Sequence, residues 1–132
     1  MPISNEVRQL LRLAERDYRV FLVLKDAEGI DLASACFHAQ QSVEKFLKAV
    51  LAWRGSVFRR THDLLELAGL IEDAGLALPV ENDELGALNP YGVMVRYDDT
   101  VPDTVTRERA ALMLTAIADW ANALLSEERN SR

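Results

Sequence analysis

Residues 32–55, LASACFHAQQSVEKFLKAVLAWRG, carry the clearest structural pattern in the sequence. Their apolar side chains recur every three or four positions, which is the period of one face of an α-helix. Asp31 stands where a carboxylate can accept the first free backbone N–H groups, and Gly55 suits the turn after a last helical residue. The segment therefore predicts a long helix with a defined start and end. The apolar positions are Leu32, Cys36, Ala39, Val43, Leu47 and Val50.

The same apolar period recurs before and after this segment and predicts helices nearly everywhere. Four further helices are expected: about 3–25, about 64–74, one from 82 onward, and one from about 104 or 106 to 125. We expect a kink at Asn89-Pro90, because proline lacks a backbone donor and disfavours the helical region for the residue before it. Residues 96–103 (RYDDTVPD) predict an extended connection, and no window alternates long enough to require a strand.

These segments predict an all-α fold, an up-and-down antiparallel bundle of four long helices plus a shorter one. The 132 residues, 49% of them hydrophobic, suit a single domain over 1–132, with an ordered bundle over about 1–125 and a polar tail at 126–132. One cysteine, Cys36, excludes an internal disulfide and falls on the apolar face, where we expect a small core residue. No apolar run is long enough for a membrane span, and the N-terminus has no secretory stretch, so a cytoplasmic protein is expected.

The charge is unevenly distributed along the chain. A net charge of −6 argues against a protein that is basic over its whole surface and coats nucleic acid. Residues 45–60 nevertheless hold five basic side chains and no acid, whereas residues 61–103 hold ten acids against one base, Arg96. The basic group is either a solvated helix face or a local site for an anion. Its members are Lys45, Lys48, Arg54, Arg59 and Arg60.

Few residues have a pattern typical of catalysis or metal binding. His62 stands at the predicted start of the third helix, where a capping or surface role is expected, and His38 lies on the second helix away from most of its apolar seam. No Cys/His cluster has the spacing of a zinc site, and the scattered glycines form no phosphate-binding loop. We therefore expect no metal, no cofactor and no catalytic residue. Glu44 and Lys48 are spaced for an i,i+4 pair, and the neighbouring glutamines indicate a polar groove or a subunit contact.

From about Ala14 to Leu124 the chain resembles small bacterial and archaeal HEPN-domain proteins. The resemblance is carried by ACFHAQQSVEKFLKAVLAWRG (35–55), THDLLELAGLIEDAG (61–75), Tyr91 and the Arg96-Tyr97-Asp98 segment, in that order. It implies an up-and-down helical bundle that usually dimerises, so a homodimer is expected.

The resemblance also implies one of two activities. Many HEPN proteins are metal-independent ribonuclease toxins, in which an arginine, four to six residues and a histidine form the site at a dimer interface. Others are companions of a minimal nucleotidyltransferase, which they bind. Here Arg96 is followed by seven residues without a histidine, and Arg54 and His62 are too far apart in the sequence. This absence favours the companion, because the nuclease would lack its general base.

We therefore expect a non-catalytic HEPN homodimer that partners a minimal nucleotidyltransferase, in a toxin–antitoxin-like or nucleotide-binding pair. The alternative is a metal-independent HEPN ribonuclease toxin with a departed motif, in which His62 or His38 is the base, and a third interpretation is a scaffold that binds the partner alone. Basic side chains would contact phosphate and a tyrosine would stack on a base, with a nucleotide or RNA as further ligand. The expected nucleotide- or partner-binding residues are Gln41, Lys45, Lys48, Arg96 and Tyr97.

Overall fold

The computed structural model describes residues 3–92 and 104–130, with side chains described up to residue 126. Within these residues every regular element is a helix, which confirms the all-α prediction. The elements are α1 (Asn5–Leu24), α2 (Leu32–Trp53), α3 (Leu64–Asp73), α4 (Asn82–Leu88), the short 3-10 helix η1 (Asn89–Gly92) and α5 (Arg107–Asn130). No helix in the described part of the chain is long and apolar enough to cross a membrane.

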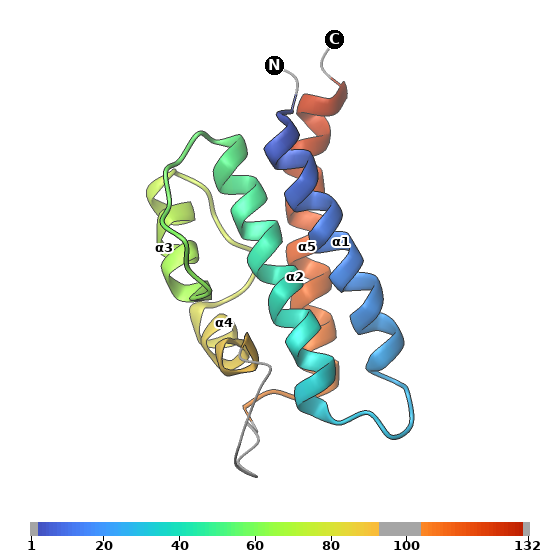
Figure 1. The fold of residues 1–132 in the computed structure, drawn as a ribbon. Helices are drawn as coiled ribbons and strands as arrows, with labels where there is room; N and C mark the ends of the chain where they lie inside the picture. The colour runs from blue at the N-terminus through green and yellow to red at the C-terminus, as the bar shows by residue number, and fades with distance from the viewer. Residues whose placement is uncertain (1–2, 93–103, 131–132) are drawn as a thin grey trace.

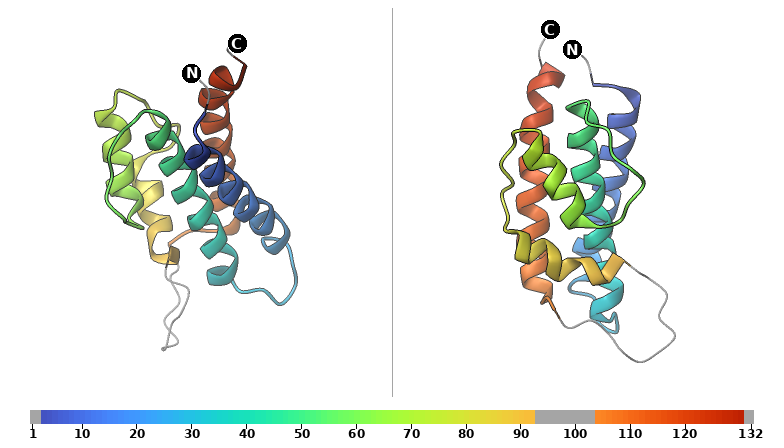
Figure 2. Two further views of the ribbon diagram at one scale, coloured as in Figure 1. Left: turned by 45° about the horizontal axis from the view of Figure 1, so that its top comes forward. Right: turned by 90° about the vertical axis from the view of Figure 1, so that its left-hand side faces the viewer.

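The three long helices form the body of the molecule, and α2 is its centre (Figure 1). Helix α1 runs antiparallel to α2, and α5 runs in the same direction as α2 (Figures 1 and 2). The short helices α3 and α4 lie beside α2, on the side away from α1. Twelve of the 22 residues of α2 are buried, against five of the 20 in α1, because α2 has neighbours on every side.

The proportions of the bundle differ from the expected four long helices and one short. Three helices are long, with 20, 22 and 24 residues, and two are short, with ten and seven. Gly75 ends α3 with a positive φ of 85°, a backbone region that glycine adopts without a Cβ clash. Because α3 and α4 are short and joined by loops, the chain returns to the start of α2 before α5 begins. As a result α5 is parallel to α2, and the expected alternation of directions stops after α1 and α2.

The helix ends follow the sequence in most places. The Ser4 side chain accepts from the Val7 N–H at the start of α1, and the Asp63 side chain accepts from the Leu65 N–H at the start of α3. Asp31 is the N-cap of α2, but its side chain makes no capping hydrogen bond. The kink expected at Asn89-Pro90 is confirmed, since the chain tightens there from α4 into η1.

Helix α5 continues to Asn130, so the helical backbone extends into the polar tail expected at residues 126–132. The sequence SEER after Leu125 contains good helix formers and no proline or glycine, so the helix has no reason to end there. Residues 96–103, expected as an extended connection, lie outside the described residues.

The core is apolar and continuous, and most of its largest side chains are fully buried. Cys36 is fully buried in it, as predicted, and burial raises the pKa of its thiol to about 11. Five polar side chains are also buried, and two of them are carboxylates. Because an ionised carboxylate taken out of water needs partners, the core has to supply them. The five residues are Asp17, Gln40, Ser42, Glu44 and Thr61.

Candidate functional site

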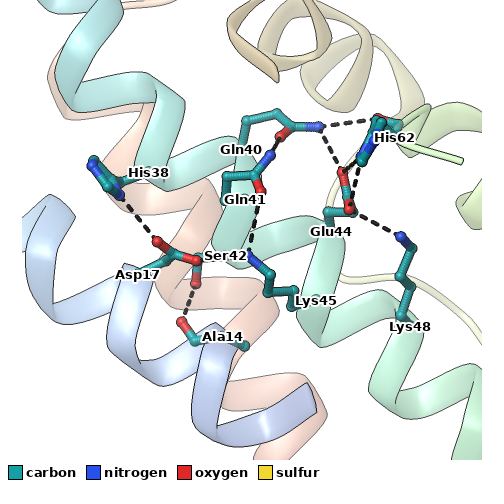
Figure 3. A network of polar contacts seen from close by, with 10 residues as sticks. All are labelled: Ala14, Asp17, His38, Gln40, Gln41, Ser42, Glu44, Lys45, Lys48 and His62. Atoms are coloured by element: carbon teal, nitrogen blue, oxygen red, sulfur yellow. Dashed lines mark hydrogen bonds and ion pairs between the residues drawn. The ribbon is translucent and has the colours of Figure 1, made fainter. Parts of the chain in front are cut away.

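A network of polar side chains extends along α2 and joins it to α1 and to the loop before α3 (Figure 3). It is built around two buried carboxylates, Asp17 from α1 and Glu44 from α2, which are 5% and 3% exposed. Each carboxylate is held by one lysine and one histidine. We call the two halves the Asp17 cluster (Asp17, His38, Lys45) and the Glu44 cluster (Glu44, Lys48, His62).

The Asp17 cluster joins helix α1 to helix α2. The Lys45 Nζ donates to Asp17 Oδ2 at 2.9 Å, and the His38 Nδ1 lies 3.0 Å from Asp17 Oδ1. Next to it the Ser42 hydroxyl donates to the carbonyl of Ala14 at 2.7 Å. Both oxygens of Asp17 therefore have a partner on α2, and this part of the network fixes α1 against α2.

The Glu44 cluster joins α2 to the loop that precedes α3. The Lys48 Nζ donates to Glu44 Oε2 at 3.0 Å, which confirms the expected i,i+4 pair. The His62 Nδ1 lies 3.1 Å from Glu44 Oε1 and 3.2 Å from Oε2. The pair is built on a carboxylate that is only 3% exposed.

Two glutamines connect the clusters, and we call Gln40 and Gln41 the glutamine bridge. The Lys45 Nζ donates to Gln41 Oε1 at 3.3 Å, and the Gln41 amide donates to Gln40 Oε1 at 2.8 Å. The Gln40 amide then donates to the carbonyl of His62 at 3.0 Å and to Glu44 Oε1 at 3.4 Å. The glutamines therefore connect the two clusters through side-chain hydrogen bonds.

The segment that carries His62 is fixed by hydrogen bonds to Asn89. The Asn89 amide donates to Asp63 Oδ1 at 2.8 Å, and Asn89 Oδ1 accepts from the Leu64 N–H at 2.9 Å. These contacts join the start of α3 to the end of α4. The hydrogen bond from Asn89, together with the N–H groups at the helix start, lowers the pKa of the Asp63 carboxyl.

The two histidines differ in how accessible their imidazole rings are to solvent. Where Nδ1 carries the proton and donates to the carboxylate, Nε2 is left as a free acceptor. The side chain of His62 is 70% exposed, so its Nε2 is accessible to solvent, whereas that of His38 is 24% exposed. A histidine oriented by a carboxylate is the usual arrangement of a general base. The Glu44 cluster therefore offers an accessible acid–base group, and the Asp17 cluster much less of one.

The five residues expected to bind a nucleotide or partner fall into two groups. Gln41, Lys45 and Lys48 lie together in the network, each bonded to another of its side chains. Arg96 and Tyr97 lie outside the described residues. The sequence reasoning missed Asp17, the charge at the centre of one cluster. The available signal was an acid on the apolar stripe of α1, between Ala14 and Phe21.

The basic group at residues 45–60 is not one continuous surface. Lys45 and Lys48 are paired with the buried carboxylates, and the Arg54 guanidinium donates to the carbonyl of Ala74. Arg59 makes a two-pronged contact with Glu66 at 2.9 and 2.6 Å, which raises the pKa of the guanidinium. No set of three or more acidic, cysteine or histidine side chains in the described residues is placed to hold a metal ion.

Comparisons with known proteins agree on the fold. The family model for the HEPN domain matches residues 7–122. Among solved structures, the crystal structure of ST0689, an archaeal HEPN homologue, is similar with a TM-score of 0.57 and 22% sequence identity. The match covers 90% of this chain and 97% of that one, and at this identity it establishes the fold alone. No curated protein matches the sequence significantly.

Proposed function

This chain belongs to the HEPN-domain family, and we propose that it is a non-catalytic member that binds a minimal nucleotidyltransferase. The observation that carries the proposal is the pairing within the network: both lysines and both histidines of the two clusters are bonded to a buried carboxylate. These pairs fix the surface beside the two clusters, and no histidine follows Arg96 at the spacing of the ribonuclease members of the family, so the sequence favours binding over cleavage. In the proposal the protein is a cytoplasmic homodimer, as in a toxin–antitoxin-like or nucleotide-binding pair.

The polar side chains that border the clusters are the proposed nucleotide- or partner-binding residues. The side chains of Lys45 and Lys48 are 18% and 14% exposed, so their ammonium groups reach the surface only in part. A phosphate that approached either one would compete with Asp17 or Glu44. Nucleotide binding here is therefore expected to be weak without the partner, with Arg96 and Tyr97 as its other proposed contacts.

Co-purification with the cognate nucleotidyltransferase tests the proposal. We expect a stable complex, a dimer of this chain by sedimentation at micromolar concentration, and no RNA cleavage. Gln41→Ala is a suitable probe of the bordering surface, because it removes an amide while both carboxylate pairs stay intact. Absence of a complex, together with absence of nucleotide binding by calorimetry, would refute the proposal. A complex that is indifferent to Gln41→Ala and to removal of both lysines would leave the scaffold interpretation.

A second candidate function is metal-independent RNA cleavage, with His62 as the base. Its specific support is the exposed imidazole, which is oriented by the buried Glu44. In such a reaction Nε2 would accept the proton of a ribose 2′-hydroxyl, and Glu44 would stabilise the resulting imidazolium. Incubating the purified protein with RNA and a chelator distinguishes the two candidates. Cleavage that is lost in His62→Ala and kept in His38→Ala would favour the ribonuclease.

A further inference from the structure

Helix α1 presents a line of arginines to solvent. Arg12, Arg16 and Arg19 are all exposed, and their spacing of four and three residues places them on one face. The line extends for about 10 Å along the helix at 1.5 Å per residue. We call it the arginine face. It lies on the side of α1 turned away from α2, so it is separate from the Asp17 and Glu44 clusters.

These arginines have no ion pair or hydrogen bond within the described part of the chain. Other cationic side chains do: Lys25 pairs with Asp26, and Arg109 pairs with Glu84. Arg107 donates to the carbonyls of Leu24, Lys25 and Ile30. In a chain with 21 acidic and 15 basic residues, three unpaired arginines on one helix face make that face locally positive and leave their guanidinium groups free to bind carboxylates of another molecule.

Exposed apolar side chains border the arginine face at one end. Leu22 is 40% exposed and Val23 is 70% exposed, in the last turn of α1. On α5, Leu112 is 65% exposed. The hydrogen bond of 2.9 Å between Tyr18 and Thr115 joins the two antiparallel helices, and Leu22 and Leu112 both lie one turn beyond it toward the same end. Arginine is enriched at protein interfaces, and a protein bound here would also cover the exposed aliphatic side chains of Leu22, Val23 and Leu112.

We propose that the arginine face and its apolar border are the docking surface for an acidic surface of the partner protein. The inference rests on the proposed function, because it takes the nucleotidyltransferase as that partner. Guanidinium groups bind carboxylates with two parallel hydrogen bonds, which makes arginine better suited than lysine to such a contact. The surface of the partner protein is expected to carry a row of carboxylates with an apolar patch beside it.

A second copy of this chain fits the surface poorly. A two-fold contact through α1 would place the three arginines against their own copies, and like charges in contact cost affinity. Homodimerisation would therefore use another face and leave this one open for a different protein.

Nucleic acid also fits less well than an acidic protein. The aromatic ring nearest the face is Tyr18, which is half-buried and has its hydroxyl bonded to Thr115, so it offers no platform for a base. Leu22 and Val23 would stay in water on a nucleic acid, whereas a protein would cover them.

Charge reversal tests the docking surface. The triple variant Arg12→Glu/Arg16→Glu/Arg19→Glu is compared with wild type for affinity to the purified cognate nucleotidyltransferase. Arg60→Glu is the matched control for Arg16→Glu, since Arg60 is exposed and unpaired among the described residues and the charge change is equal. We expect the triple variant to lose at least about 100-fold in affinity, Arg16→Glu about 10-fold and Arg60→Glu no more than about twofold. Wild-type affinity is expected to fall as salt rises.

Each result separates the docking surface from the proposed function. A wild-type complex that the triple variant retains at full affinity would overturn the docking surface and leave the proposed function standing. Absence of a wild-type complex would overturn the docking surface and, together with absence of nucleotide binding, the proposed function as well. If the triple variant keeps the enzyme but loses binding of a labelled single-stranded RNA, the surface belongs to nucleic acid and the inference is wrong. Circular dichroism and thermal melts should be unchanged, because all three positions are exposed.

Discussion

The Asp17 and Glu44 clusters contain the same three chemical groups in different settings. Each has a buried carboxylate, a lysine and a histidine, with contacts of 2.9 to 3.2 Å. The members of the Asp17 cluster all come from two packed helices. In the Glu44 cluster the histidine comes from a loop, and its side chain is 70% exposed against 24% for His38.

The two clusters have the same side chains, so the difference in the exposure of their histidines comes from the elements that carry them. Two helices hold His38 between them, so its contact with Asp17 mainly fixes their packing. A loop holds His62 on one side only, so its contact with Glu44 leaves a ring nitrogen accessible. The same three groups therefore give a helix cross-link in one place and an accessible, oriented imidazole in the other.

Removing a lysine is expected to have the largest effect, and more so in the Asp17 cluster. Lys45→Met leaves Asp17 buried with His38 as its remaining hydrogen-bond partner, which should reduce the free energy of unfolding by about 3 kcal/mol. Lys48→Met should reduce it by about 2 kcal/mol, because Glu44 retains donors from both Gln40 and His62. Urea unfolding followed by circular dichroism measures both values.

The control for this prediction removes the charge as well as its partner. In Asp17→Asn/Lys45→Met the buried group is neutral and can still bond to His38, so at least half of the lost stability should return. If the double variant is as unstable as the sum of its single changes, the cost does not come from an unpaired buried carboxylate.

The histidines provide the most direct test of the contrast. His38→Ala should lower the free energy of unfolding by about 1.5 kcal/mol, since it removes a partner of a carboxylate between two helices. His62→Ala should lower it by less than about 0.5 kcal/mol, because the side chain is mostly in solvent. Equal losses in the same urea experiment would mean that both clusters are structural in the same way.

Adding a methyl group beside the glutamine bridge should weaken the connection between the clusters. A Cβ on Gly92 would lie 2.9 to 3.1 Å from the end of the Gln40 side chain, which would have to move. Gln40 would then lose contacts to Gln41, Glu44 and His62, and we expect a loss of about 1 kcal/mol in Gly92→Ala. Gly86→Ala is the control, since its Cβ would meet an ordinary contact at 3.7 Å with Leu65. Equal stability of the two variants would show that Gln40 relocates without cost.

The helical fold could be predicted from local patterns, and the network could not. The apolar period, the N-cap position of Asp31 and the break at Pro90 all depend on residues close together in the sequence, so the sequence displays them directly. The partners of Lys45 and Glu44 lie 28 and 18 residues away, and they depend on how α1 and the loop before α3 lie on α2. The spacing along the chain therefore predicted the pair of Lys48 with Glu44, one turn apart, but not the pairing of Lys45 with Asp17 on α1.

The packing of α3 and α4 could not be predicted from local patterns either. Glycine and proline mark where these helices end, but the direction of each helix relative to α2 depends on which of its faces the long helices bury. The available sign of the network was a charge where an apolar side chain was expected: Asp17 on the buried stripe of α1. A charged residue on a core-facing stripe predicts a buried partner, even when the sequence does not say which one.

The smallest expected effect concerns Asp63, which anchors the segment that carries His62. Its pKa is lowered, chiefly by the hydrogen bond from Asn89, so the ionised form stabilises the fold at pH values above the ordinary value of 3.8. That contribution should disappear as pH falls through the lower folded pKa. Asp63→Asn keeps an oxygen for the cap and for Asn89 but removes the charge, so wild type should exceed it by about 0.5 kcal/mol at pH 6, and this difference should shrink as the pH is lowered below 3.8. Other carboxylates titrate in both proteins and cancel in the difference. A difference that stays constant over this range would mean that the Asp63 charge does not help to hold the His62 loop, and the accessible imidazole would then owe its position to Glu44 and Gln40 alone.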